Sequence, residues 1–185
     1  MSRFSLIQPL LNGLTLIERQ PTGDQRGFFE RLFCTHELEY VMGDRVVVQI
    51  NRTFTAKQGA VRGLHFQYPP AAEMKLVTCL QGEIFDVAVD LRDGSSFLQW
   101  HAELLSAGNL RTLVIPEGFA HGFQTLTDDC ELIYLHTARY DPEEEGGLSP
   151  LDPRLAIEWP LVISELSDRD KSHSMIDESF KGLVV

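Results

Sequence analysis

Cysteine is scarce in this sequence, and the three present, Cys34, Cys79 and Cys130, form an odd set without CxxC spacing. So sparse a set predicts a reduced, cytoplasmic protein. No apolar run approaches the ~20 residues that a transmembrane helix needs, and the first residues, Met-Ser-Arg-Phe-Ser, lack the apolar stretch of a signal peptide. We therefore expect no membrane partner.

Positive charge is also in short supply, since 16 Lys and Arg residues stand against 27 Asp and Glu residues and the formal net charge is −11. Contacts to phosphates dominate the affinity for nucleic acid, so this balance argues against a nucleic-acid partner. An anionic small ligand would need a local cluster of the Lys and Arg residues. A Gly-rich phosphate loop and a GxSxG nucleophile motif are both missing, which weighs against a bound dinucleotide and against serine hydrolase chemistry.

What the sequence does contain is a series of short β segments separated by Gly-containing turns. Its 185 residues, of which 43% are hydrophobic, suffice for one domain with a full core, and we expect a single domain over residues 1–185. Helical periodicity is confined to Thr35–Val41 and Ser164–Ser172. Many short strands at this spacing predict an all-β, antiparallel sandwich or barrel. The expected strands are Leu14–Glu18, Phe28–Phe33, Val46–Phe54, Val61–Phe66, Lys75–Leu80, Ile84–Leu91, Trp100–Leu105, Leu110–Ile115, Gly122–Leu126 and Glu131–Thr137.

Two motifs, RGLHFQ with the following KLV and the later PEGFAH, resemble the paired motifs of the cupin superfamily, small β-barrels that often carry a metal. The resemblance implies a jelly roll. In a metal cupin the first motif supplies two histidines and a carboxylate, and the second supplies a third histidine. Here His65 and His121 remain, but Gln67 and Lys75 occupy the other two positions. A protonated amine repels a divalent cation and has no lone pair to donate, so we expect no metal in this site.

Strand periodicity places the polar residues of several strands on shared faces. The pairs are Gln49 with Asn51, His65 with Gln67, Lys75 with Val77 and Tyr134 with His136. If these faces line the barrel interior, the polar groups converge in one pocket, as in a binding site. The same period puts alternate residues from Phe85 to Leu91 on one face.

Each candidate residue has an ordinary alternative. His65 is either a satisfied barrel histidine or a general base, and Lys75 is either a surface residue or a cation that stabilises an oxyanion. Tyr134 is either a core tyrosine or a general acid. Asp168 and Asp170 are either exposed acids at a helix start or, for one of them, the partner that orients a histidine. The run that ends at Glu145 is either a solvated loop or a ligand contact.

Taken together, these motifs resemble the dTDP-4-dehydrorhamnose 3,5-epimerase family of deoxysugar biosynthesis, from about Asp24 to Lys171. Its members act without metal or cofactor on a nucleotide-linked 4-keto-6-deoxyhexose. The carriers of the resemblance are Asp24–Phe28, Gln49–Asn51, Val61–Gln67, Lys75–Val77, Gly82–Arg92, Ile115–Phe123, Thr137–Tyr140 and Trp159–Pro160.

The resemblance implies a role for each matching residue. His65 would remove the proton beside the C4 ketone, Asp170 would hold its imidazole, and Lys75 would stabilise the enolate. Tyr134 would return a proton from the opposite face. Tyr140 would stack on the base of the nucleotide. The residues that would bind the nucleotide sugar are Arg26, Gln49, Asn51, Arg62, His121, Tyr140, Glu145 and Arg169.

The chain departs from the family pattern at the substrate pocket or its rim. The family usually has a glutamate four residues after the glycine of the Arg-Gly pair, where this chain has Arg31, with Glu30 one place earlier. A one-residue shift turns a strand side chain to the other face. The segment Asn51–Thr55 replaces a more serine-rich one, and Ser149–Pro153 lacks the usual Trp-Asn.

The resemblance also implies a homodimer, because family members pair their barrels and exchange N-terminal strands, for which the apolar segment Phe4–Leu16 is suited. The predicted activity is epimerisation at C3 and C5. Alternatives are an epimerase that inverts one centre or uses another 4-keto sugar, a metal-dependent cupin oxygenase, and a sugar-binding cupin without activity.

Overall fold

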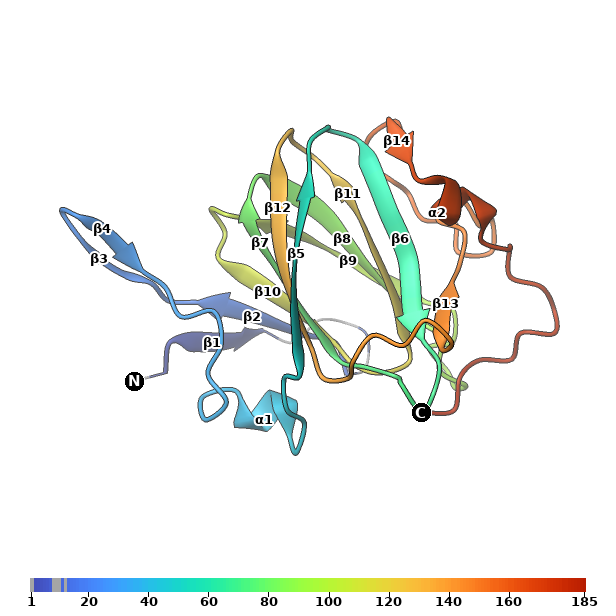
Figure 1. Cartoon of the computed structure of the whole chain (residues 1–185), viewed down its shortest axis with the longest axis horizontal. Coiled ribbons are helices and arrows are strands. Elements are labelled where there is room, and N and C mark those ends of the chain that lie inside the picture. The colour runs from blue at the N-terminus through green and yellow to red at the C-terminus, as the bar shows by residue number, and fades with distance from the viewer. Residues whose placement is uncertain (1, 8–10, 12) are drawn as a thin grey trace.

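Two antiparallel sheets form the body of the protein in the computed structural model, which describes residues 2–7, 11 and 13–185 (Figure 1). In the described residues the first sheet runs β1 (Phe4–Ile7), β2 (Thr15–Arg19), β10 (Arg111–Ile115), β7 (Lys75–Gln81), β12 (Cys130–His136) and β5 (Gln49–Thr55). The second runs β13 (Glu145–Gly147), β6 (Ala60–Gln67), β11 (Phe119–Thr125), β8 (Glu83–Asp90) and β9 (Trp100–Ser106), with β14 (Glu165–Leu166) parallel to β6. The predicted antiparallel β class is confirmed.

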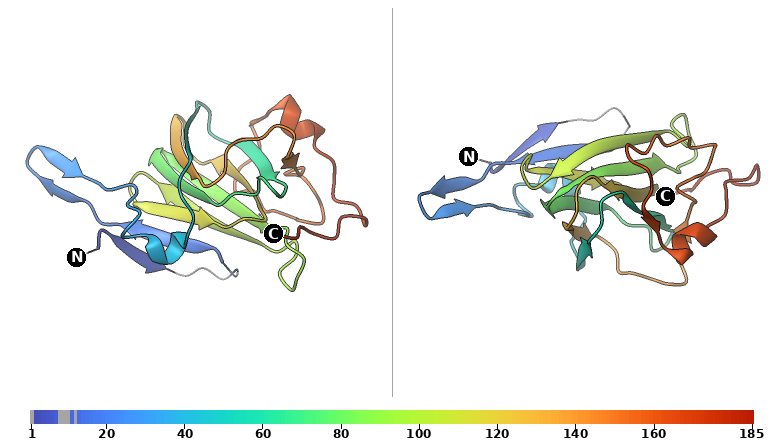
Figure 2. Two further views of the ribbon diagram at one scale, coloured as in Figure 1. Left: turned by 60° about the horizontal axis from the view of Figure 1, so that its bottom comes forward. Right: turned by 90° about the horizontal axis from the view of Figure 1, so that it is seen from above.

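A separate hairpin of β3 (Thr22–Asp24) and β4 (Gly27–Phe29) projects from the body, as the views of Figures 1 and 2 agree. The two helices of the described residues, α1 (Glu39–Met42) and α2 (Asp168–Ser172), are short. The C-terminal segment that carries α2 runs along the outside of the second sheet (Figure 1).

Each predicted strand has a counterpart in the structure, but Val46–Phe54 begins three residues before β5, and three other predicted elements are much too long. Only Gly27–Phe29 of the Phe28–Phe33 region pairs as a strand, because its sole partner is the three-residue β3. The first predicted helix shrinks to α1, and the second to α2. Within Ser164–Ser172, Glu165 and Leu166 pair with β6, so the helix begins only after Ser167, whose backbone is extended and whose hydroxyl caps Asp170.

The hydrophobic core lies between the sheets, where alternate residues of each strand point inward. Ile84 and Ala88 of β8 belong to this cluster, together with Val77, Phe123 and Leu132. The next residues along β8, Val87 and Val89, face the other way and pack under the C-terminal segment, in one cluster with Leu155, Ile176 and Leu183. The predicted shared face from Phe85 to Leu91 is confirmed, and it is the outer face of the barrel wall.

Candidate active site

A cavity of about 240 Å³ opens between the two sheets. Strand register explains why polar side chains gather here, since Lys75, His136 and Gln49 are cross-strand neighbours and so are Tyr134 and Asn51. Residues two apart share a face, so both rows point the same way. The sequence predicted this convergence. The lining residues are Gln49, Asn51, Thr53, Arg62, His65, Phe66, Gln67, Glu73, Lys75, Tyr134, His136, Tyr140 and Glu145.

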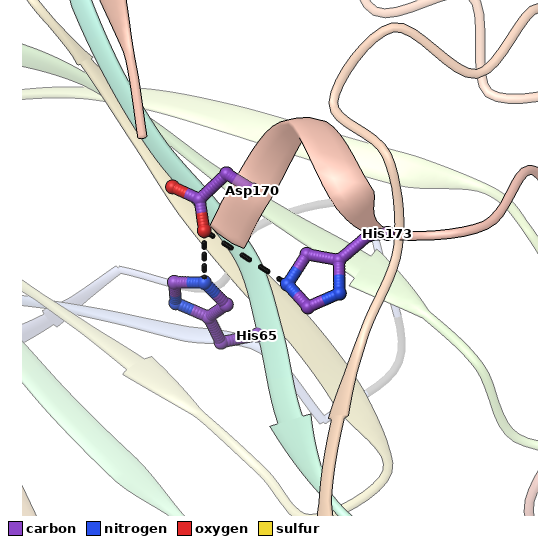
Figure 3. A group of neighbouring side chains, drawn as sticks. All are labelled: His65, Asp170 and His173. Atoms are coloured by element: carbon purple, nitrogen blue, oxygen red, sulfur yellow. Dashed lines mark hydrogen bonds and ion pairs between the residues drawn. The ribbon is translucent and has the colours of Figure 1, made fainter. Parts of the chain in front are cut away.

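His65 forms a dyad with Asp170. The imidazole Nε2–H donates to Asp170 Oδ1 over 2.7 Å, which leaves Nδ1 as the basic atom (Figure 3). Burial would raise the pKa of Asp170, but the hydrogen bonds from His65, the Gly63 N–H and Ser167 outweigh it and hold the pKa below its ordinary value. Of the two aspartates left open by the sequence, Asp170 is the one that reaches His65, while Asp168 is exposed and pairs with Lys171.

His173 is a second histidine at this dyad. Its Nε2 lies 3.8 Å from Asp170 Oδ1, has no hydrogen-bond partner in the described structure, and faces His65 edge to face (Figure 3). Burial, then the positive charge of His65, lowers the pKa of His173. Among the described residues, His65, Asp170 and His173 bring their ligand atoms within 4.8 Å of one another, close enough to hold a metal ion. This set differs from the cupin ligand set, so the expectation of no metal at that set stays a prediction.

Lys75 is buried at the cavity wall, with 8% of its surface exposed, which rules out the alternative of a surface lysine. Its Nζ lies 3.2 Å from Glu73 Oε1 and donates to the His65 carbonyl over 3.4 Å. Glu73 in turn accepts from His136 Nδ1–H over 2.9 Å. An ammonium inside a pocket is suited to stabilise a developing oxyanion.

Tyr134 lines the cavity and contacts a second histidine–aspartate pair, His121 and Asp86. Burial, and then the charge of Asp86, raises the pKa of the Tyr134 phenol, which therefore stays protonated and able to donate. His121 Nε2 lies 2.7 Å from Asp86 Oδ1, and its ring meets the ring of Tyr134 edge to face at 6.0 Å. His121 is buried behind Tyr134 and does not belong to the described cavity lining, so its predicted contact with the sugar nucleotide stays a prediction.

Five predicted binding residues lie at the mouth of the cavity or beside it. The Tyr140 hydroxyl donates to Glu145 Oε2 over 2.8 Å, and Arg169 forms an ion pair with the same carboxylate. The Tyr140 N–H donates to Gln49 Oε1 over 3.1 Å. Arg62 lines both this cavity and a larger hollow of about 1220 Å³ that also contains Arg169, so two guanidinium groups lie where an anionic ligand would enter.

Arg26 is not brought to the cavity. It lies in the projecting hairpin, its side chain is 89% exposed, and it pairs with Asp24 at 2.6 Å (Figure 1). Arg31, which stands where the family usually has a glutamate, and the neighbouring Glu30 also do not line the cavity. Glu30 pairs with Arg19, and Arg31 pairs with Glu37. The predicted contact of Arg26 with the nucleotide sugar therefore stays a prediction.

Sequence reasoning placed His136 in the predicted pocket without giving it a role, and it missed three further polar residues of the site: Glu73, Asp86 and His173. Period two put His136 on the face of Tyr134, and the same period carried two residues back from Lys75 would have found Glu73. Asp86 sits in an apolar strand, where a buried carboxylate calls for a partner. Nothing in the sequence placed His173 near His65, because their proximity depends on the path of the C-terminal segment.

Comparison with known proteins separates the competing functions. The sequence profile of the dTDP-4-dehydrorhamnose 3,5-epimerase family matches residues 8–178. The chain belongs to this family. It is 40% identical to the dTDP-4-dehydrorhamnose 3,5-epimerase of Salmonella typhimurium, covering 94% of this chain and 96% of the relative, and 41% identical to that of Escherichia coli K12, covering 94% and 95%.

Solved structures of epimerases share the fold. That of dTDP-6-deoxy-D-glucose-3,5-epimerase from Legionella pneumophila, in complex with dTDP-4-keto-L-rhamnose, superposes with a TM-score of 0.90 at 39% identity, covering 98% of this chain and 99% of that one. A 3′-monoepimerase from Streptomyces bikiniensis, in complex with dTDP-quinovose, gives a TM-score of 0.85 at 33% identity, covering 91% and 87%. The predicted family and its cupin-type fold are confirmed.

Proposed function

We propose that this family member is a cofactor-independent isomerase that inverts C3 and C5 of a dTDP-linked 4-keto-6-deoxyhexose. The reaction would convert dTDP-4-dehydro-6-deoxy-D-glucose into dTDP-4-dehydro-L-rhamnose. The observation that carries the proposal is the His65–Asp170 dyad in a cavity that also holds Lys75 and Tyr134. A base, an oxyanion stabiliser and an acid are the groups that epimerisation beside a ketone requires.

The chemistry follows from the acidity of the carbons beside the C4 ketone. His65 Nδ1 takes the proton from C3 or C5, and Asp170 stabilises the imidazolium that forms. The electron pair moves onto the C4 oxygen, where the Lys75 ammonium stabilises the enolate. When the ketone re-forms, Tyr134 delivers a proton to the opposite face of the carbon and the centre is inverted.

The nucleotide half of the substrate is anionic, and the mouth of the cavity supplies Arg62 and Arg169 despite the acidic net charge. Tyr140 is exposed at this mouth, where its ring is available to stack on the base. Gln49 and Asn51 present amides to the sugar from β5.

A homodimer completes the proposed site. The β3–β4 hairpin exposes Phe28 by 73% and Phe29 by 60%, beside the exposed Arg26. Exposed aromatic residues on a projecting hairpin are typical of an interaction surface. The expected exchange of N-terminal strands involves Phe4–Leu16, of which residues 8–10 and 12 lie outside the described residues.

We propose that the protein is cytoplasmic. Its cysteines Cys34, Cys79 and Cys130 are all free thiols, as expected in a reducing compartment. Among the described residues, no helix has the length and apolar character to cross a membrane.

The test is NMR of the enzyme with dTDP-4-dehydro-6-deoxy-D-glucose in D₂O, following deuterium uptake and configuration at each carbon. Uptake and inversion at both C3 and C5 support the proposal. Inversion at C3 alone supports a second function, a one-centre epimerase, which the likeness to the Streptomyces 3′-monoepimerase favours. No uptake at either carbon contradicts both and leaves a sugar-binding protein.

A further inference from the structure

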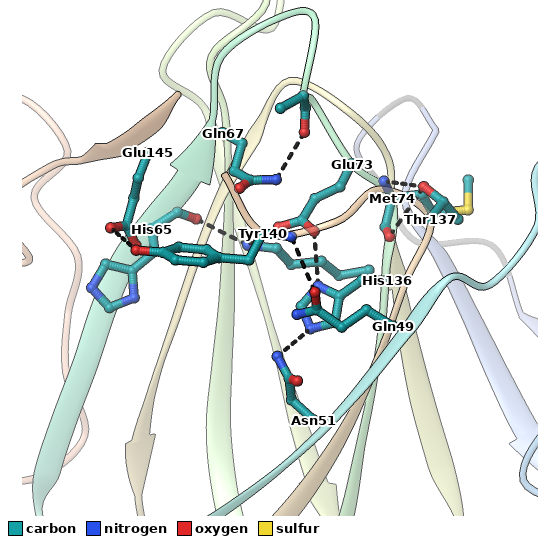
Figure 4. A network of polar contacts seen from close by, with 12 residues as sticks. Gln49, Asn51, His65, Gln67, Glu73, Met74, His136, Thr137, Tyr140 and Glu145 are labelled. Atoms are coloured by element: carbon teal, nitrogen blue, oxygen red, sulfur yellow. Dashed lines mark hydrogen bonds and ion pairs between the residues drawn. The ribbon is translucent and has the colours of Figure 1, made fainter. Parts of the chain in front are cut away.

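A continuous chain of polar contacts crosses the cavity beside the proposed catalytic groups (Figure 4). The Asn51 amide N–H donates to His136 Nε2 over 3.3 Å, and His136 Nδ1–H donates to Glu73 Oε2 over 2.9 Å. The other oxygen of Glu73 lies 3.2 Å from Lys75 Nζ, which donates to the His65 carbonyl over 3.4 Å. This series of contacts thus begins on β5 of one sheet and ends on β6 of the other, at the residue that carries the proposed base.

We propose that Glu73, held by His136, is the positioning residue that fixes the Lys75 ammonium beside the substrate carbonyl. This inference rests on the proposed function. Lys75 has a flexible four-carbon stem, and its ammonium offers three donors. Glu73 and the His65 carbonyl engage two of them, which leaves the third for the enolate oxygen.

Glu73, Lys75 and His136 are all largely buried, which restricts how their side chains can move. The side chains of Glu73, Lys75 and His136 are 8%, 10% and 11% exposed. Burial would raise the pKa of Glu73, but His136 and Lys75 outweigh it and lower the pKa, so Glu73 is an ionised carboxylate in the cavity wall. A buried carboxylate with both oxygens engaged cannot rotate freely, and it holds the ammonium in one place.

His136 has a definite orientation in this arrangement. The Asn51 N–H occupies its Nε2 lone pair, so the ring proton sits on Nδ1 and points at Glu73. His136 lies opposite Lys75 in the β12–β7 ladder, so the backbone itself sets the distance between these two side chains. Both features couple the position of Glu73 to the rigid sheet rather than to a loop.

The test compares three variants in the D₂O assay with the wild-type enzyme. Glu73→Gln keeps the shape and removes the charge, and should lower kcat about 10- to 100-fold, the cost of misplacing a catalytic group, while KM changes less than about threefold. Lys75→Met removes the stabiliser itself. Adding Glu73→Gln to Lys75→Met should lower kcat no further, because the group on which Glu73 acts is gone. Losses that multiply in the double variant, or a kcat for Glu73→Gln within about threefold of wild type, would overturn the proposal.

Two substitutions of His136 form a matched pair that does not depend on how well Glu73→Gln folds. Asn places its side-chain N–H where Nδ1 stands and can still hold Glu73, whereas Gln reaches the position of Nε2 and cannot. We expect His136→Asn to retain at least about tenfold more kcat than His136→Gln, and we expect the kcat of His136→Gln to fall to the level of Glu73→Gln. Equal kcat in the two His136 variants would overturn the proposal that Glu73 is held by His136. Any 4-keto sugar nucleotide that the wild-type enzyme exchanges serves here, so these ratios are separate from the question of which centres are inverted.

Discussion

At the scale of single residues, the chemistry of the site depends on which polar atoms are already engaged by neighbours and which remain available to the substrate. Asp170 occupies His65 Nε2 and Glu73 occupies one side of Lys75. Tyr134 is kept protonated by burial and by Asp86. Each group is therefore left with one chemical role, base, cation or acid, and each role can be removed separately.

His65→Ala should lower turnover about 10²- to 10⁴-fold, the usual contribution of a general base. The fold should survive, because His65 is only partly buried and its removal leaves Asp170 with the Gly63 and Ser167 contacts. Circular dichroism checks the fold and the D₂O assay checks turnover. Near wild-type exchange in a folded His65→Ala protein contradicts the assignment of the base.

Tyr134→Phe should separate deprotonation from inversion. His65 can still remove a proton and return a deuteron to the same face, so exchange continues while inversion falls. One NMR time course measures both rates. If inversion keeps pace with exchange at C3 and C5, Tyr134 is not the acid, and Tyr140 or an ordered water becomes the candidate.

The dyad also predicts how stability depends on pH. The pKa of Asp170 is lowered in the folded state, so its contribution to stability is present above the unfolded value of 3.8 and is lost as the pH falls through the folded pKa, below 3.8. Asp170→Asn should therefore be less stable than wild type at neutral pH, and the difference should shrink in acid. Urea unfolding of both proteins at a series of pH values, from neutral to below 3.8, measures the difference in their free energy of unfolding. Asp168→Asn is the control, since its exposed ion pair with Lys171 should contribute little at any pH.

At the scale of elements, α2 is too short to form without help, and its cap provides that help. The Ser167 hydroxyl accepts from the Asp170 N–H over 3.0 Å, so one contact both begins the helix and fixes the residue that holds His65. Ser167→Ala should cost about 1 kcal/mol of local stability. Amide exchange in α2 should speed up and kcat should fall, while Ser167→Thr keeps both. Unchanged exchange in α2 contradicts the role of the cap.

The same elements show how far the sequence could predict the structure. Short β segments between Gly-containing turns located β5 to β12, and period two correctly assigned the shared face of Phe85, Val87, Val89 and Leu91 in and after β8. The hairpin strands β3 and β4 are exposed on both sides and carry no such pattern. Within Ser164–Ser172 the pairing of β14 with β6 outweighed local helical preference, and that pairing is a tertiary contact. His65 and Lys75 lie within local sequence motifs, so they could be predicted. The position of His173 depends on the path of the C-terminal segment, which no local pattern encodes.

At the scale of the whole molecule, the cavity and the hairpin lie far apart in one chain. The β3–β4 hairpin, whose turn contains Arg26, projects away from the body (Figures 1 and 2), yet the resemblance to the family implies that Arg26 binds the nucleotide sugar. The two facts agree if one copy lends its hairpin to the other, which would also cover Phe28 and Phe29. Light scattering at micromolar concentration should then give twice the chain mass of 20.9 kDa. A mass of one chain contradicts the dimer.

Mixing two impaired variants tests whether Arg26 acts across the dimer. Arg26→Ala should raise KM about 10- to 100-fold through the loss of a charged hydrogen bond, and His65→Ala should lower turnover about 10²- to 10⁴-fold. In a symmetric dimer with a lent hairpin, the hybrid of the two variants has one site that combines His65 of the first chain with Arg26 of the second. Refolding the two variants together should therefore restore about a quarter of the wild-type activity per chain at low substrate, because half of the dimers are hybrids with one intact site of two. If Arg26 instead served its own chain, each hybrid site would lack one of the two residues, and no activity would return on mixing.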